Sequence, residues 1–353
     1  MKICFAVNDM NSGGAERVVA TLANKFVLEG HNVYILMVSA SNAYSFYYLD
    51  KSINLVALIN SDVDKTIRGR IKSYKQFLLR IKPDVVLSFL PHVNIYSSFV
   101  CKKMRIPVVL CERTDPASYS LIYRFLLKLS FKKANGCVFQ TPNAMRFYGK
   151  KIAKKGIVIV NPVKLDFIPP TKILRKKQIV AVGRLIKTKN YYLLIDAFSK
   201  FNKVVKGYTL NIYGDGPLKK EIENHIHLKG LDEQIILKGN SKTWQQESFD
   251  SHFYVLTSNF EGMPNALLES LSIGLPSIST DCRIGGPKFI SSHSTRLHLV
   301  DCNDTESLVA TMIDVSKHYV DDTYDESFYN FVKIDNIYKY WIDYLDKIIR
   351  RKK

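Results

Sequence analysis

The stretch HFYVLTSNFEGMPNALLESLSIGLPSIST, residues 252–280, contains the pattern from which the fold can be predicted. Its first seven residues form an apolar run typical of a buried strand, and PSIST at 276–280 forms a second one. The segment between them predicts a helix, in which Pro264 suits the first turn. A strand, a helix and a further strand in this order indicate two parallel strands joined by a crossover helix.

The same alternation continues on both sides of this stretch. Further strands are predicted at residues 2–7, 32–39, 84–89, 106–111, 136–141, 157–160, 178–183, 208–214 and 234–239. Strands that alternate with helices predict parallel sheets covered on both faces. The predicted fold class is therefore α/β, with two doubly wound, Rossmann-like domains that face each other across a cleft.

A segment rich in Pro and Lys, residues 166–177, interrupts the alternation. We therefore expect a first domain at 1–165, a linker at 166–177 and a second domain at 178–330. The length of 353 residues suits two domains of ordinary size. The composition, 46% hydrophobic and 24% charged, excludes a disordered or fibrous chain.

The sequence favours a cytoplasmic location. It has no run of 18 uncharged apolar residues, and the start MKICFAVNDM is unlike a signal peptide. The six cysteines show no C-x-x-C spacing, so neither a disulfide framework nor a zinc site is predicted.

Positive charge is concentrated in the first half of the chain. The formal net charge is +19, and residues 1–165 hold 25 basic and 9 acidic residues. Such an excess suits nucleic acid, an anionic membrane surface or a phosphate-bearing substrate, and charge alone does not choose among them. Because no nucleic-acid-binding motif is present, we expect no nucleic-acid partner.

Two glycine-containing loops are candidate anion sites. Gly13 and Gly14 follow the first strand, where glycines let the backbone approach a ligand and helix N–H groups point at an anion. After the strand at 178–183, Arg184 and Lys189 could clamp a diphosphate, with Lys187 as a substitute. The alternatives are a tight turn without a ligand and a solvated basic loop.

Two carboxylates lie in and after the loop that follows residues 252–258. Glu261 precedes the predicted helix and Glu269 lies inside it, eight positions later. Carboxylates accept hydrogen bonds from sugar hydroxyls, and the N–H groups at the helix start offer an anion site. As the alternative, Glu269 is a surface helix residue and Glu261 an acid favoured by the helix dipole.

Five segments together resemble a known family. They are GGAER (13–17), VNPV (160–163), GRLIKTKN (183–190), YGDGPLKKEI (213–222) and EGMPNALLE (261–269). In this order they resemble retaining glycosyltransferases of the GT-B architecture, specifically glycosyltransferase group 1. The resemblance implies transfer of a hexose or N-acetylhexosamine from a nucleoside-diphosphate sugar, with a UDP-sugar favoured. It also implies that residues 331–353 form a helix that packs back on the first domain.

The resemblance implies a role for each matching residue. Arg184 and Lys189 would neutralise the donor diphosphate, Glu261 would bind the transferred sugar, and Glu269 would bind the ribose. Further donor contacts would come from Gly13, Gly14, Gly183, Gly214, Gly262, Met263, Pro264, Asn265 and Leu268. The acceptor would attack from the leaving-group face and give its proton to a donor phosphate oxygen. No protein nucleophile, metal or cofactor is then expected.

The chain departs from the family pattern at Arg113. Many members have a His there, and an Arg cannot act as a base. Arg113 could instead bind a phosphate of donor or acceptor, or order its loop, and His92 is a second candidate polar contact. Asp62-Val63-Asp64 has the form of a D-x-D metal motif, but it is far from every donor motif, so no metal site is predicted.

Two basic segments of the first half suit a membrane surface. Residues 65–82 carry seven cations, and Ile67, Ile71, Tyr74 and Leu78 recur at the spacing of one helix face. Residues 119–133 mix aromatics, leucines and four cations, which is typical either of an interfacial helix or of a helix packed on the sheet.

We therefore expect a peripheral enzyme at the inner face of the cell membrane. Its acceptor would be a growing surface glycan that could be linked to polyprenyl diphosphate. The alternatives are a nucleotide-sugar epimerase, a noncatalytic nucleotide-sugar- or membrane-binding subunit of a glycan-assembly complex, and an RNA-binding protein.

Overall fold

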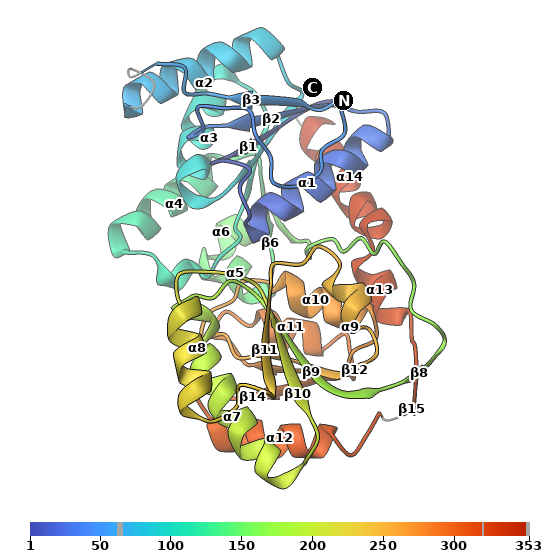
Figure 1. The fold of residues 1–353 in the computed structure, drawn as a ribbon. Coiled ribbons are helices and arrows are strands. Elements are labelled where there is room, and N and C mark those ends of the chain that lie inside the picture. The colour runs from blue at the N-terminus through green and yellow to red at the C-terminus, as the bar shows by residue number, and fades with distance from the viewer. Residues whose placement is uncertain (62–65, 320, 351–353) are drawn as a thin grey trace. The chain divides into compact units, whose positions relative to one another are not determined.

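The computed structural model describes residues 1–61, 66–319 and 321–350. The chain divides into two compact units, of which unit 1 contains Met1–Lys164 and Lys333–Lys353 and unit 2 contains Leu165–Val332. Each unit is built around one parallel sheet, drawn in Figure 1. The predicted α/β class is therefore confirmed.

The sheet of unit 1 has seven strands within the described residues. In spatial order they are β3 (Asn54–Ala57), β2 (Asn32–Met37), β1 (Lys2–Val7), β4 (Val85–Phe89), β5 (Val108–Cys111), β6 (Gly136–Phe139) and β7 (Gly156–Val158). The helices of this unit are α1 (Gly14–Leu28), α2 (Ile67–Ile81), α3 (Pro91–Met104), α4 (Leu121–Lys133), α5 (Pro142–Phe147), α6 (Lys150–Ala153) and α14 (Ile334–Arg350). The strand order reverses between β1 and β4, as in a doubly wound sheet.

The main sheet of unit 2 has six described strands. In spatial order they are β11 (Ile235–Gly239), β10 (Thr209–Tyr213), β9 (Lys176–Val182), β12 (Ser251–Leu256), β13 (Ser277–Thr280) and β14 (Leu297–Val300). The helices are α7 (Tyr191–Val204), α8 (Lys219–Leu228), α9 (Trp244–Ser248), α10 (Asn265–Ser272), α11 (Gly286–Ser291), α12 (Thr305–Val315) and α13 (Ser327–Val332). The strand order reverses between β9 and β12. Ligands of open α/β sheets bind at such a reversal, beyond the carboxyl ends of the strands.

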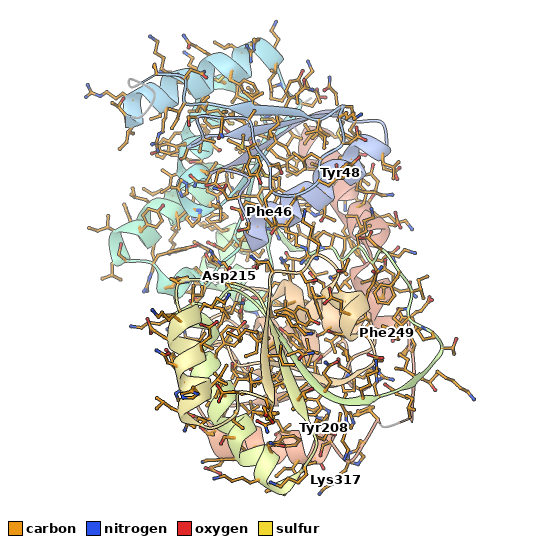
Figure 2. All side chains as sticks on the ribbon, viewed as in Figure 1. Phe46, Tyr48, Tyr208, Asp215, Phe249 and Lys317 are labelled. Atoms are coloured by element: carbon orange, nitrogen blue, oxygen red, sulfur yellow. The ribbon has the colours of Figure 1, made fainter. Side chains whose placement is uncertain are left out.

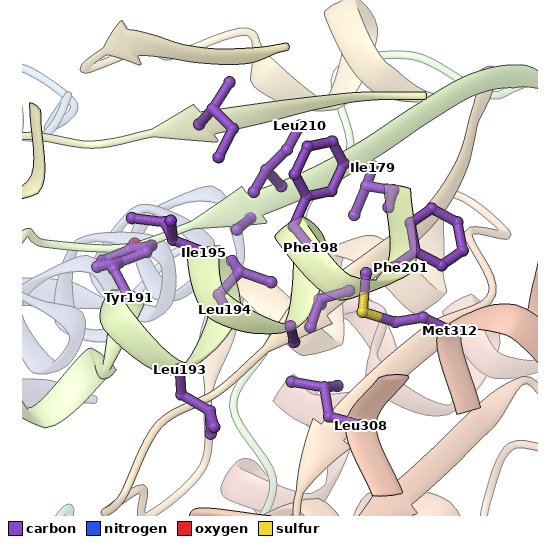
Figure 3. Packing of buried hydrophobic residues seen from close by; sticks show 14 of the residues in the cluster. Ile179, Tyr191, Leu193, Leu194, Ile195, Phe198, Phe201, Leu210, Leu308 and Met312 are labelled. Atoms are coloured by element: carbon purple, nitrogen blue, oxygen red, sulfur yellow. The ribbon is translucent and has the colours of Figure 1, made fainter. Parts of the chain in front are cut away.

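The core of unit 2 forms around helix α7. Leu194, Phe198 and Phe201 are fully buried, and Figure 3 shows them between the strand residues Ile179 and Leu210 and residues of α12. Buried apolar side chains at this spacing hold α7 on the sheet. The loop that precedes α7 therefore ends at a helix whose position is fixed by the core.

Strands at the edges of the sheets are the main additions to the prediction. β3 and β14 were not predicted, and neither was the antiparallel pair formed by β8 (Lys172–Leu174) and β15 (Asp321–Thr323). β8 lies inside the segment expected to be a linker. β3 and β14 are only partly buried, and β15 reads DDT, so they lack the continuous buried apolar run that identifies strands as short as β5 and β6.

Helix α14 is part of unit 1, where it packs beside α1 (Figure 1). Trp341 is completely buried, and its ring centroid lies 6.4 Å from that of Phe89. The Tyr344 hydroxyl accepts a hydrogen bond from the Cys137 amide at 2.8 Å and donates one to the Lys155 carbonyl at 2.6 Å. Helix α14 thus completes the core of unit 1, whose other elements come from Met1–Lys164.

Only part of the predicted apolar face of helix α2 is buried. Tyr74 and Leu78 are buried as an amphipathic helix requires, but Ile67 and Ile71 are 65% and 38% exposed. The apolar side chains of Ile67 and Ile71, in the first two turns, therefore face solvent.

Candidate functional site

The predicted donor residues of unit 2 follow three neighbouring parallel strands. Gly183 and Arg184 follow β9, Gly214 follows β10, and Glu261 lies in the loop after β12. Because β10, β9 and β12 are adjacent and parallel, their carboxyl ends lie at one edge of the sheet. The structure therefore brings these loops together at the place where the strand order reverses.

Lys189 and Glu261 form an ion pair at this edge. The Lys189 Nζ lies 2.5 Å from Glu261 Oε1, and the two side chains are 21% and 14% exposed. The backbone that carries Lys189 is fixed by Thr257, whose hydroxyl donates to the Lys189 carbonyl at 3.0 Å. It is also fixed by the Asn259 amide, which donates to the Thr188 carbonyl at 2.8 Å. Thr257 and Asn259 are supporting residues that the sequence analysis did not identify.

Glu269 is buried, with 3% of its surface exposed. Its Oε2 accepts hydrogen bonds from Trp244 Nε1 at 3.2 Å and from Gln245 Nε2 at 2.9 Å, both from helix α9. The alternative that Glu269 is a surface helix residue is therefore wrong. Trp244 and Gln245 orient the carboxylate, and no spacing in the sequence connects them to it.

Arg184 differs from Lys189 in its surroundings. It is exposed, and its side chain makes no hydrogen bond or ion pair with any residue that the structure describes. Lys187 is also exposed. Because the Lys189 ammonium already has a carboxylate partner, Arg184 and Lys187 add net positive charge to the loop after β9, which suits an anion.

Glycines allow the loops at this edge to touch through their backbones. Gly214 has a φ of +139°, and a Cβ placed on it would lie 2.0 Å from the Gly183 carbonyl oxygen. A Cβ on Gly286 would lie 2.0 Å from the Gly262 carbonyl oxygen. Larger residues at Gly214 and Gly286 would force the loops apart, so these glycines fix where the backbone of the site lies.

The start of helix α10 holds the remaining predicted donor residues. The helix begins at Asn265, and Pro264 is its N-cap rather than a residue of its first turn. Met263 and Pro264 are buried, and Gly262 and Asn265 are partly exposed. Leu268 is completely buried, so its side chain contributes packing and has no exposed surface for a ligand.

Unit 1 holds the other predicted residues, and it is described separately. Gly13 is the N-cap of α1 and Gly14 its first residue. His92, at the start of α3, has its Nε2 2.8 Å from Asn8 Oδ1, and burial lowers its pKa. The strand ends of β1 and β4 thus present an imidazole and an amide side by side.

Arg113 is only 8% exposed. Its Nη1 donates to Asn161 Oδ1 at 2.7 Å, and its guanidinium lies 4.8 Å from the centroid of the Phe89 ring. The neighbouring Glu112 accepts hydrogen bonds from the hydroxyls of Tyr148 and Tyr119, and burial raises its pKa. These contacts order the loop after β5, which was one of the two readings left open for Arg113.

Within the residues that the structure describes, no three His, Cys, Asp or Glu side chains form a group that could hold a metal ion. Asp62, Val63 and Asp64 lie outside the described residues. A pocket of about 470 Å³ lies between the end of β3 and α2, lined in part by Lys72, Gln76 and Arg80. None of the predicted site residues lines this pocket.

Two family models match successive parts of the chain. The model described as Glycosyltransferase Family 4 matches residues 12–167, and the model described as Glycosyl transferases group 1 matches residues 165–327. Together they cover both units of the fold except for the ends of the chain.

Curated relatives align along most of the chain. One, from Campylobacter jejuni, is 28% identical over 318 residues, which is 87% of each protein. It is named GalNAc-alpha-(1->4)-GalNAc-alpha-(1->3)-diNAcBac-PP-undecaprenol alpha-1,4-N-acetyl-D-galactosaminyltransferase. The amylovoran biosynthesis glycosyltransferase AmsD of Erwinia amylovora is 23% identical, over 86% of each protein. A second Campylobacter N-acetylgalactosaminyltransferase, which acts on an undecaprenyl diphosphate-linked sugar by its name, is 26% identical over 90% of this chain and 91% of the relative.

Solved structures show the same fold. HepE of Anabaena, in complex with UDP and glucose, superimposes with a TM-score of 0.80 at 14% identity, covering 98% of this chain and 100% of the other. The lipopolysaccharide outer core galactosyltransferase WaaB, in its apo form, gives a TM-score of 0.74 at 20% identity, covering 98% of this chain and 99% of the other.

Proposed function

Because the chain belongs to the GT-B glycosyltransferases, we propose that it transfers a hexose or N-acetylhexosamine from a UDP-sugar to a lipid-linked or growing surface glycan, with retention of configuration. The observation that carries the proposal is the cluster at the carboxyl edge of the second sheet. There the Lys189–Glu261 pair and Arg184 lie in loops after adjacent strands, and the buried Glu269 lies within helix α10. Two cations and two carboxylates suit a ligand that carries both phosphates and hydroxyl groups.

In the proposed reaction the residues of unit 2 bind the donor. Arg184 and Lys189 neutralise the diphosphate, and they stabilise the negative charge that grows on it as the bond to the sugar breaks. Glu261 accepts hydrogen bonds from the transferred sugar, and Glu269 from the ribose. The Lys189–Glu261 pair holds both side chains in place before the donor arrives, so less ordering is needed on binding.

The proposed chemistry is an exchange of one glycosidic bond for another. The bond between the sugar C1 and the diphosphate oxygen breaks, and a bond between C1 and the acceptor oxygen forms on the same face. The acceptor proton passes to an oxygen of the leaving diphosphate. In this scheme the protein supplies binding and charge, and no metal or other cofactor is required.

The names of the relatives support the choice of acceptor and donor. Both Campylobacter relatives transfer N-acetylgalactosamine to a glycan on undecaprenyl diphosphate, by their names, and the HepE structures contain UDP. We propose the same classes here, a polyprenyl-diphosphate-linked acceptor and a UDP-sugar donor. The enzyme would then work at the cytoplasmic face of the cell membrane.

The surface of unit 1 supports peripheral membrane binding. At the start of α4, Leu121, Ile122 and Phe125 are 78%, 76% and 62% exposed, and only the later residues Leu127, Ser130 and Phe131 are buried. The helix therefore has fully buried side chains only in its second half. Exposed apolar residues on a basic helix suit an anionic bilayer. No helix in the described part of the chain is long and apolar enough to span a membrane.

A titration with UDP tests the donor site. Replacement of Arg184 with alanine should weaken UDP binding about tenfold or more, because a charge-assisted hydrogen bond to the diphosphate is lost. Calorimetry in the presence of EDTA measures this, since the proposal requires no metal. Lys203→Ala is the matched control, because it removes an exposed cation at the opposite end of α7.

The control should bind UDP like the parent. If the parent does not bind UDP, or if Arg184→Ala binds as tightly as Lys203→Ala, the assignment of the donor site is wrong. A second outcome is that the protein binds UDP but that no acceptor accelerates the release of UDP from a UDP-sugar. The protein is then a binding subunit and not a transferase.

Membrane binding is tested with the exposed residues of α4. The triple variant Leu121→Ser, Ile122→Ser, Phe125→Ser should lose most of its binding to phosphatidylglycerol vesicles, because the apolar surface available for insertion is removed. Its UDP affinity should stay unchanged. Co-sedimentation with vesicles is the measurement, and undiminished binding would show that α4 is not the membrane contact.

A further inference from the structure

The loop between β2 and β3 carries an unusual group of aromatic residues. Its residues 44–48 read YSFYY, and we name them the aromatic loop. Tyr44, Phe46 and Tyr48 are 55%, 38% and 77% exposed. Figure 2 labels Phe46 and Tyr48 on this loop. The Phe46 ring packs edge-on against Tyr47, with 5.2 Å between ring centroids, and keeps part of its surface open to solvent.

The backbone of the aromatic loop is fixed to the first glycine loop. The Phe46 amide donates to the Met10 carbonyl at 2.9 Å, and the Tyr47 hydroxyl donates to the Gly13 carbonyl at 2.9 Å. Farther along, the Asn24 side chain donates to the Tyr48 carbonyl at 2.9 Å. The exposed rings therefore stand on an anchored backbone, and binding a ligand would cost little ordering of the chain.

The anchoring contacts separate the roles of the four aromatic residues. Tyr47 is partly buried and holds the loop to Gly13, so it has a structural task. Tyr44 and Tyr48 make no hydrogen bond through their hydroxyls to any described residue. Their rings and hydroxyls are both available to a ligand. Each tyrosine thus offers a flat apolar face and a polar hydroxyl at its tip.

The chemistry of the aromatic loop suits a sugar. A pyranose ring has an apolar C–H face that packs on an aromatic ring, and its rim of hydroxyls accepts and donates hydrogen bonds. We propose that the aromatic loop binds sugar rings of the glycan acceptor through Tyr44, Phe46 and Tyr48. This inference rests on the proposed function, because it assigns that function's acceptor to a named surface.

The charge around the loop favours a glycan over a lipid surface. Residues 41–50 contain no Lys or Arg and contain the acid Asp50, and the one cation that follows directly, Lys51, stands beside this acid in the sequence. The exposed apolar residues of α4, in contrast, stand on a helix that carries Arg124, Lys128, Lys132 and Lys133. An anionic bilayer would be attracted to α4 and not to the aromatic loop. A neutral oligosaccharide needs no cation.

Titrations with defined oligosaccharides test the proposal. The probes are N-acetylgalactosamine and its α-1,4-linked di- and trisaccharides, which carry neither lipid nor phosphate, and binding is followed by ligand-observed NMR. The double variant Tyr44→Ala, Tyr48→Ala should bind the trisaccharide at least about fivefold more weakly than the parent, because two stacking faces are lost. Tyr48→Phe should retain most of the affinity. Tyr340→Ala, which removes a tyrosine of α14 with similar exposure to Tyr44, is the matched control.

UDP and phosphatidylglycerol vesicles are measured with the same variants, and both affinities should stay at the parent value. The proposal is overturned if the parent binds none of the three saccharides, or if the double variant binds them as well as Tyr340→Ala does. It is also overturned if the double variant loses vesicle binding instead, which would make the loop a lipid contact. Failure of the parent to bind UDP would refute the donor site, while the saccharide titrations would still decide the role of the loop.

Discussion

Replacement of Lys189 with alanine should lower the rate of sugar transfer by about 100-fold or more. In the proposed reaction the Lys189 ammonium stabilises the charge that develops on the leaving diphosphate, and losses of this size follow when one such preorganised contact is removed. The same change leaves the Glu261 carboxylate without the partner 2.5 Å away. Unit 2 should therefore also lose stability, by about 1–2 kcal/mol for a pair that is mostly buried. The rate of UDP release measures the effect on transfer, and chemical denaturation measures the effect on the free energy of unfolding.

The double variant Lys189→Ala, Glu261→Ala separates stability from catalysis. It should regain stability relative to either single variant, because no uncompensated charge remains, but it should stay inactive. The exposed pair Lys200–Glu306 provides the control, since its loss should change neither quantity measurably. A double variant that recovered both stability and activity would show that the Lys189–Glu261 pair is structural only.

Replacement of Glu269 is expected to have the second large effect. Glu269→Ala removes the acceptor for Trp244 Nε1 and Gln245 Nε2, two donors that lie in a buried environment. Each unpaired donor costs about 1–3 kcal/mol, so unit 2 should be clearly destabilised. Glu269→Gln keeps one acceptor oxygen for these donors, and its free energy of unfolding should be closer to that of the parent.

The glutamine variant isolates the proposed contact with the ribose. Its affinity for UDP should fall about tenfold, because a charge-assisted hydrogen bond to a ribose hydroxyl is lost. Its affinity for 2′,3′-dideoxy-UDP should remain at the parent value, since that ligand has no hydroxyl to lose. Equal losses for both ligands in calorimetric titrations would mean that Glu269 acts through the fold of unit 2 and does not touch the ribose.

The long strands and helices were predictable because they carry their own periodicity. β1 and β10 differ from the predicted ranges by at most two residues, and α7 and α10 occupy predicted helical stretches. β3 and β14 were missed because they are only partly buried and carry no continuous apolar run, unlike the equally short but fully buried β5 and β6. The family and the fold followed from the loops between the longer elements, whose spacing the sequence displays.

The surroundings of the candidate site were less predictable. Arg184, Lys189, Glu261 and Glu269 could be named because they occupy fixed positions in short segments. That Lys189 pairs with Glu261, 72 positions later, depends on the adjacency of β9 and β12. Trp244 and Gln245 belong to a five-residue helix with no motif, and only the folded chain brings them to Glu269. Contacts between distant segments carry no local signal.

Helix α14 has a consequence for the synthesis of the chain. The helix supplies the buried Trp341 and Tyr344 to unit 1, but it is translated after every residue of unit 2. All of unit 2 has therefore left the peptidyl transferase centre before the core of unit 1 can be filled. Until α14 is translated, Phe89 and Cys137 lack the cover of Trp341 and Tyr344, so we expect chaperones to protect unit 1 most at this nascent stage.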